Sequence, residues 1–183
     1  MSIVDTYLDL LDSQRESAFN ILDGIKDSQL WTPPAPKEWS IGQLLNHNYL
    51  LFSSTVPYVK LAWKYSHKRG ESHRNRSYQT KIGDVYREPK FPRWVGFLWK
   101  PKYSAKNPVP IEKLEEEIRT LHSEVRTFYD GKDEAVLGNV FLFDPLFGWI
   151  NLIVTLRIGI YHDQLHFDDI IKFAGEMGRN HAD

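Results

Sequence analysis

The stretch that decides the fold of this 183-residue chain is GWINLIVTLRIGIYHDQLHFDDIIKF, Gly148 to Phe173. It carries two histidines, His162 and His166, and a separation of four residues places both imidazoles on one face of an α-helix. The other residues of that face are small or apolar: Gly148, Leu152, Thr155, Gly159, Ile170 and Phe173. The pattern predicts one long helix that points both histidines into the interior of the protein.

Two inward-facing imidazoles suggest a metal site, but the pair alone has a simpler explanation. A chain with seven histidines contains such a spacing by chance often enough that the spacing is weak evidence. A buried neutral histidine is also satisfied by hydrogen bonds, and Asp163 and Asp169 are close enough in sequence to accept them. A metal site therefore requires a third ligand from elsewhere in the chain.

The composition narrows the class of protein. A net charge of −1 gives no electrostatic argument for nucleic acid or for an anionic membrane as a partner. The chain has no cysteine, which excludes disulfides, thiolate metal sites and a cysteine nucleophile, and fits a reducing cytoplasm. No signal peptide is apparent, and the most apolar stretch, around Leu146 to Ile160, is too short to span a bilayer. We expect a soluble, cytoplasmic protein of one domain, residues 1–183.

Two further helices precede the middle of the chain. The first is predicted from Ile3 to about Ile25, and the three prolines of Trp31 to Trp39 form a stiff loop after it. Ser40 and Gln43 then form a capping box, in which each side chain caps the other's backbone N–H. This marks the start of a second helix, about Ser40 to Tyr65, which Pro57 is expected to kink or break.

The second helix supplies the candidate third ligand, His47. Its face also carries Leu44, Leu50 and Leu51, which indicates that the imidazole points inward. Polar residues on the inward faces of the second and last helices are predicted to line a pocket: Gln43, Ser54, Tyr58 and Thr155. The same pattern also fits an ordinary core with polar residues at its ends.

Residues 66–110 are basic and aromatic, and we interpret them as a long crossover connection. Its aromatic residues are predicted to cover one end of the protein or the mouth of a site: Phe91, Trp94, Phe97, Trp99 and Tyr103. Basic residues mixed with aromatics also occur in single-strand nucleic-acid platforms, but the balanced charge disfavours that function.

A third helix is predicted from Pro110 to about Tyr129, with His122 beside its apolar face and therefore at the surface. Asp144 and Pro145 are a typical N-cap and first-turn pair for the last helix, and the residues after Phe173 are expected to fray. Long helices joined by proline-rich connections predict an all-α four-helix bundle with a long connection between helices 2 and 3.

Three motifs in this order resemble the DinB-like superfamily, which includes YfiT-like metal-dependent hydrolases. They are Trp-Ser-Ile-Gly-x-Leu-Leu-x-His (Trp39 to His47), Pro-x-Phe-Gly (Pro145 to Gly148) and His-x-x-x-His (His162 to His166). The resemblance implies a DinB-type four-helix bundle, commonly a homodimer, with a divalent metal bound by His47, His162 and His166. Zinc is the first expectation, although imidazole ligands also suit nickel, iron and manganese.

The resemblance implies an enzyme that acts on a small molecule, either a thiol S-transferase that activates a low-molecular-weight thiol or a hydrolase. The alternative is a non-catalytic metal-binding or stress-response module. The chain departs from the common pattern at Asp144, where many members have His, and at Asp168-Asp169, where Arg-Gln is common. The His-x-x-x-His motif also lacks the glutamate of metallopeptidases. Asp163 and Asp169 are the candidates to orient the metal-binding imidazoles.

Overall fold

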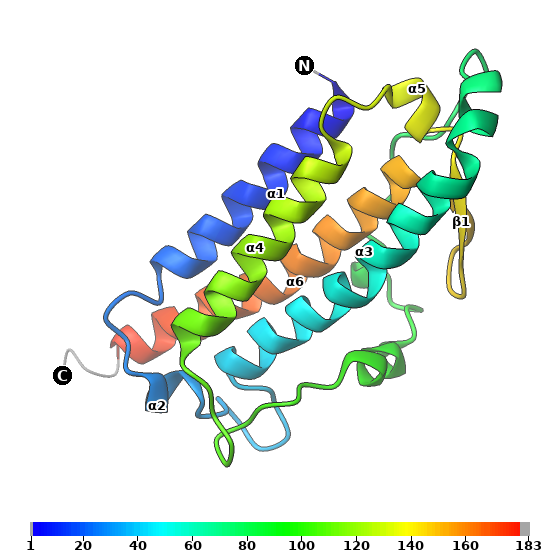
Figure 1. Ribbon diagram of the computed structural model, residues 1–183. Helices are drawn as coiled ribbons and strands as arrows, with labels where there is room; N and C mark the ends of the chain where they lie inside the picture. Colours follow the sequence, from blue (N-terminus) through cyan, green and yellow to red (C-terminus); the bar gives the residue numbers. More distant parts are fainter. Residues whose placement is uncertain (1, 180–183) are drawn as a thin grey trace.

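The computed structural model describes residues 2–179, apart from the side chains of residues 93, 94, 178 and 179. Four long helices form a bundle (Figure 1): α1 (Ile3–Asn20), α3 (Ile41–Ser72), α4 (Ile111–Tyr129) and α6 (Leu152–Arg179). The shorter elements are α2 (Asp27–Leu30), η1 (Val85–Arg87), η2 (Arg93–Trp99), α5 (Glu134–Leu137), β1 (Phe141–Asp144) and β2 (Gly148–Asn151). The predicted fold class, a four-helix bundle with a long second connection, is confirmed.

The directions of the helices explain the long connection. In α1 and α6, Tyr7 meets Arg157 and Phe19 meets Phe167, so these two helices run side by side in the same direction. In α3 and α4, Phe52 meets His122 and Trp63 meets Phe128, so this pair is parallel too (Figure 1). Antiparallel neighbours can be joined by a short loop, whereas a parallel pair requires the chain to return along the whole helix. Residues 73–110 make that return.

Two helix boundaries differ from the predicted ones. Helix α1 ends at Asn20, short of Ile25, and α3 continues past Tyr65 to Ser72 without a break at Pro57. The turn before this proline is held by side-chain hydroxyls, since Ser54 and Thr55 both donate to the carbonyl of Leu51. Such local hydrogen bonds allow a helix to accommodate a proline. The predicted capping box of Ser40 and Gln43 is present and begins α3.

The start of the last helix was predicted wrongly. Asp144 does not cap it: its Oδ1 accepts hydrogen bonds from the backbone N–H groups of Leu146 and Phe147, in the turn between β1 and β2. Gly148 has a φ of 71°, which lets the chain reverse there. Helix α6 therefore begins only after this hairpin, where Asn151 Oδ1 accepts from the N–H of Val154 at 2.9 Å.

The other end of α6 also differs. The helix continues beyond Phe173 to Arg179, whereas fraying was expected there, and His181 lies outside the described residues. Over residues 2–179, the structure contains no helix both long and apolar enough to cross a membrane.

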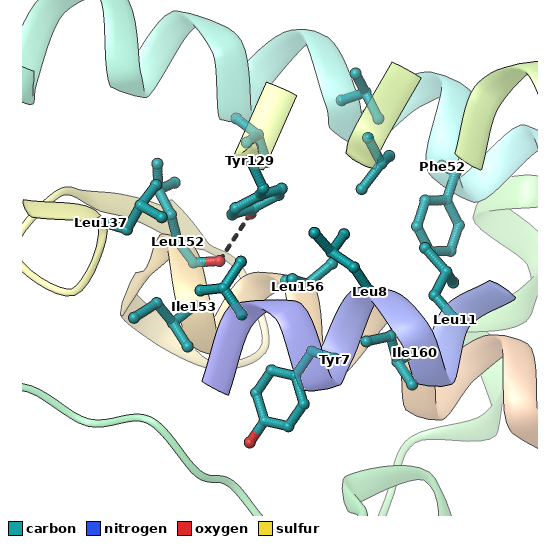
Figure 2. Close-up of a cluster of buried hydrophobic side chains, with 14 of the residues drawn as sticks. Tyr7, Leu8, Leu11, Phe52, Tyr129, Leu137, Leu152, Ile153, Leu156 and Ile160 are labelled. Carbon is teal, nitrogen blue, oxygen red and sulfur yellow. Dashed lines mark hydrogen bonds between the residues drawn. The ribbon is translucent and has the colours of Figure 1, made fainter. Parts of the chain in front are cut away.

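The buried residues form two large clusters along the bundle. One cluster lies beside the hairpin and includes Leu8, Phe52, Tyr129 and Leu156 (Figure 2). We call it the hollow end, because a cavity extends into it. The packed end lies toward α2 and has these buried members: Ala18, Phe19, Leu22, Leu30, Trp31, Ile41, Leu44, Leu45, Ile111, Leu114, Ile118, Phe167, Ile170 and Ala174. The histidines of interest lie between the two clusters along α3 and α6.

Hydrogen bonds from the bundle hold the crossover against it. Side chains of three helical or hairpin residues donate to crossover carbonyls: Tyr7 to Thr80, Asn151 to Gln79 and Tyr161 to Ile82. Farther along, Asn46 of α3 accepts from the N–H of Lys102 at 2.7 Å, and Arg87 pairs with Asp168 of α6 at 2.8 Å. The crossover is thereby fixed over the face formed by α3 and α6.

Candidate metal centre

The three predicted ligands come together. His47 of α3 and His162 and His166 of α6 each offer a ring nitrogen, and these nitrogens lie within 4.8 Å of one another. The Nε2 atoms of His47 and His162 are 3.0 Å apart. His47 and His162 are 1% and 4% exposed, and the His166 side chain is 14% exposed. Residues 115 positions apart in the chain thus form one buried imidazole cluster.

The orientation of His47 is fixed from the crossover. Its Nδ1 lies 2.7 Å from the carbonyl oxygen of Trp99, so Nδ1–H donates to that carbonyl and Nε2 keeps its lone pair. Trp99 is itself held by α3, because its Nε1–H donates to Ser54 Oγ at 2.7 Å. The Trp39 ring lies 4.8 Å from the His47 ring and covers it. This is the arrangement that orients metal-binding histidines in proteins.

The surroundings keep the rings of His47 and His166 neutral. The pKa of His47 is lowered to about 4, mainly by burial and also by the neighbouring His162. The hydrogen bond to the Trp99 carbonyl raises this pKa, but by less. Burial, together with His162 and His47, also lowers the pKa of His166 well below its ordinary value. Neutral imidazole is the form that binds metals, so at neutral pH no proton has to be removed from these two rings.

The donor set fits a divalent metal. Metal–nitrogen bonds of about 2.0–2.1 Å in a tetrahedral site separate the nitrogens by about 3.4 Å. The separations here, from 3.0 Å up to at most 4.8 Å, bracket that value, so only small ring rotations are needed. His162 Nδ1 and His166 Nδ1 are buried without a hydrogen bond, so neither ring is oriented by one as the His47 ring is.

Asp163 connects the cluster to a fourth histidine, His122. Asp163 is fully buried, its Oδ2 lies 3.0 Å from His122 Nε2, and its Oδ1 lies 3.8 Å from His162 Nδ1. Neither carboxylate oxygen makes a well-directed hydrogen bond, so these are close polar contacts. Burial opposes the charge on Asp163, but the His122 and His162 rings outweigh it and hold the pKa of the carboxyl below its ordinary value.

His122 corrects a prediction. It was expected at the surface and is 1% exposed, because α4 packs against both α3 and α1, and the His122 ring reaches Asp163 of α6 from there. Its ring lies 5.0 Å from that of Phe52. Of the two aspartates predicted to orient the imidazoles, Asp163 is near His162, and Asp169 Oδ2 lies 3.9 Å from His166 Nδ1.

The family model described as the DinB superfamily matches residues 10–170. This chain belongs to the DinB superfamily. Among solved structures it is similar to YfiT from Bacillus subtilis, described as a probable metal-dependent hydrolase with an unusual four-helix bundle topology. The identity is 15% and the TM-score 0.59, over 96% of this chain and 87% of YfiT. No curated protein matches.

In this DinB-superfamily chain the histidine cluster opens into a cavity of about 500 Å³. All three histidines line it, together with Asp169, Asp144 and aromatic side chains from the crossover, including Tyr86, Phe91 and Trp99. Phe91 and Trp99 thus cover the site as expected. Phe97 does not, since it is 73% exposed, and Tyr103 packs at the packed end. The side chain of Trp94 lies outside the described residues.

The predicted pocket residues have different positions. Thr155 lines the cavity, whereas Gln43, Ser54 and Tyr58 do not. Gln43 is used in the cap of α3, Ser54 holds Trp99, and Tyr58 is 67% exposed on the outer face. Sequence reasoning missed Tyr86, whose ring lies 5.4 Å from that of His162. The only sequence signal for Tyr86 was its position in the aromatic-rich crossover.

Proposed function

We propose that this protein is a metal-dependent hydrolase of small molecules, with a divalent metal bound by His47, His162 and His166. The observation that carries the proposal is that three imidazoles, at least two of them held neutral, converge on the wall of a cavity that also contains a carboxylate. A metal held by three imidazoles keeps a coordination position open, and it acidifies bound water and polarises a carbonyl. Zinc remains the first expectation for its identity.

Asp169 is the residue we assign as general base. Its carboxylate lines the cavity beside His166, and its side chain is 47% exposed, so water and substrate reach it. Burial raises the pKa of Asp169 above its ordinary value, which makes its carboxylate a better proton acceptor. Asp144 also lines the cavity, but its Oδ1 already accepts two backbone N–H groups. Asp163 is fully buried behind the ligands.

Transfer of a low-molecular-weight thiol, the other reaction that the family resemblance implies, would use the same three histidines. A metal-bound thiolate is already deprotonated and needs no general base. The carboxylate in the cavity therefore favours hydrolysis over thiol transfer.

The test is an assay of the protein loaded in turn with zinc, nickel, iron and manganese. Hydrolysis of aryl esters is measured beside conjugation of glutathione to an aryl halide. We expect metal-dependent hydrolysis that Asp169→Asn lowers about 100-fold or more. The matched control is Glu176→Gln, because this carboxylate lies on the same helix, is exposed and does not line the cavity.

Hydrolysis that survives metal removal, or that Asp169→Asn leaves unchanged, would contradict the assignment. Conjugation without hydrolysis would favour the thiol transferase. A protein that binds metal and catalyses neither reaction would favour the non-catalytic alternative.

A further inference from the structure

The cavity is elongated, with the histidines at one end. Along α3 its wall runs from His47 to Val59, a rise of about 18 Å at 1.5 Å per residue. Along α6, which runs the opposite way, it extends from His166 back to Thr155, a rise of about 16 Å. The cavity therefore continues for several helical turns beyond the imidazoles, into the hollow end of the bundle.

The far part of the cavity is lined mainly by apolar side chains. We call it the inner arm and define it by Val56, Val59, Val125, Phe128, Tyr129 and Leu156. These residues come from α3, α4 and α6, and among them the valines, Tyr129 and Leu156 are at most 7% exposed. None of the six is charged.

The hydroxyl groups near the inner arm already donate hydrogen bonds to backbone carbonyls. Tyr129 Oη donates to the carbonyl of Leu152 at 2.8 Å (Figure 2). Thr55 donates to the carbonyl of Leu51 and Thr155 to that of Asn151, both at 2.9 Å. A polar group of a ligand placed there would find no free side-chain donor among these three, and burying it unpaired would cost free energy. An apolar group meets no such cost.

We infer that the substrate carries a narrow apolar tail that occupies the inner arm while its reacting group lies at the three histidines. This rests on the proposed hydrolase function and specifies its substrate class as esters or amides of a medium-length alkyl or acyl chain. The roughly 18 Å of wall accommodates an extended chain on the order of ten carbon atoms. The cavity volume of about 500 Å³ is that of a site for one small ligand.

Binding of the tail is tested apart from catalysis, with straight-chain alcohols of four, eight and twelve carbons as probes. Calorimetry on metal-free His47→Ala protein measures the inner arm without the metal. We expect affinity to rise by about fourfold for each added methylene until the arm is filled. Val59→Phe and Val125→Phe, which project a ring into the arm, are expected to remove most of the gain from eight to twelve carbons. Val85→Phe is the control, since Val85 does not line the cavity.

Catalysis is then measured on the metal-loaded protein with p-nitrophenyl esters of two to twelve carbons. The inference predicts kcat/KM that rises with chain length, an optimum moved to shorter chains by Val59→Phe, and an optimum moved to longer chains by Phe128→Ala. Affinity for the alcohols that is independent of chain length, or that both filling variants leave unchanged, would overturn it. Length-dependent binding of alcohols with no ester hydrolysis would support the apolar site and overturn the proposed hydrolase instead.

Discussion

The two ends of the bundle are built from the same four helices, yet one is filled and the other is hollow. At the packed end, Trp31 of the proline-rich loop lies across α3 so closely that a Cβ on Gly42 would be 2.8 Å from its ring. At the hollow end, Val56, Val59 and Val125 are also buried, at 4–7% exposed, but border the cavity. Burial alone does not distinguish the two ends; packing does.

The difference follows from what covers each end. The packed end is closed by Trp31, whose Nε1–H donates to the carbonyl of Val109. The hollow end is covered from outside by the crossover and the hairpin, whose Tyr86, Phe91 and Phe147 line the cavity. We infer that the packed end contributes more stability per side chain, whereas the hollow end contains the cavity that begins at the histidines.

The largest expected effect is on the free energy of unfolding, when a buried leucine is shortened to alanine at each end. Leu114→Ala at the packed end removes a fully buried side chain and should lower the free energy of unfolding by about 3–5 kcal/mol. Leu51→Ala on the cavity wall should cost less, about 2 kcal/mol, because Leu51 already borders open space. Urea denaturation of both variants gives the comparison, and equal losses would show that the hollow end is packed as tightly as the other.

Acid should weaken the metal-free protein through the histidines between the two ends. The pKa of His47 is about 4 when folded and about 6.5 when unfolded, so between these pH values the unfolded chain binds more protons. Stability is fully present above pH 6.5 and is lost as pH falls toward 4, by up to about 1.4 kcal/mol per pH unit for this group. His166, whose pKa is also lowered, adds to the loss.

Unfolding at pH 7, 5.5 and 4.5 measures this dependence. His47→Gln should flatten it, whereas Leu114→Ala should lower stability similarly at each pH. A slope that His47→Gln leaves unchanged would remove His47 from the explanation.

Added volume should be costly at the packed end and nearly neutral at the hollow end. In Gly42→Ala the new Cβ meets the Trp31 ring, which is 2% exposed and hydrogen-bonded, so we expect a loss of about 1–3 kcal/mol. In Gly159→Ala the nearest atom, 2.9 Å away, is Cζ at the tip of the Phe52 ring, which lines the cavity and can move into it. The gain in helix propensity of about 1 kcal/mol should then offset that shift. Melting temperatures that fall equally in both variants would contradict the comparison.

The smallest expected effect concerns the support of His47 from the crossover. Ser54→Ala removes the acceptor for Trp99 Nε1–H while leaving the Trp99 carbonyl in the chain. We expect metal affinity to fall only a few-fold, less than the 10- to 100-fold typical of direct partners of a ligand. Competition titration with a chromophoric chelator measures it, with Ser53→Ala as the matched control. A loss of 100-fold would mean that Ser54 acts more directly.

The sequence predicts the bundle and the three histidines because both depend on helical spacing and on motifs along single helices. The helix start predicted from Asp144 and Pro145 was wrong because an Asp-Pro pair is typical both of a helix N-terminus and of a turn. Only the pairing of β1 with β2 distinguishes the two. His122 was misplaced because its burial depends on how α4 sits against two other helices. The homodimer and the native metal stay predictions.

The most direct test of the central claim is the metal content of the untagged protein by mass spectrometry, after loading with zinc and removal of free ions. The account predicts one divalent ion per chain, lost in folded His47→Ala, His162→Ala and His166→Ala. His73→Ala, whose ring contacts the carbonyl of Arg69 at the end of α3, should retain the ion. A wild-type protein that binds no metal, or three histidine variants that keep it, would contradict the account.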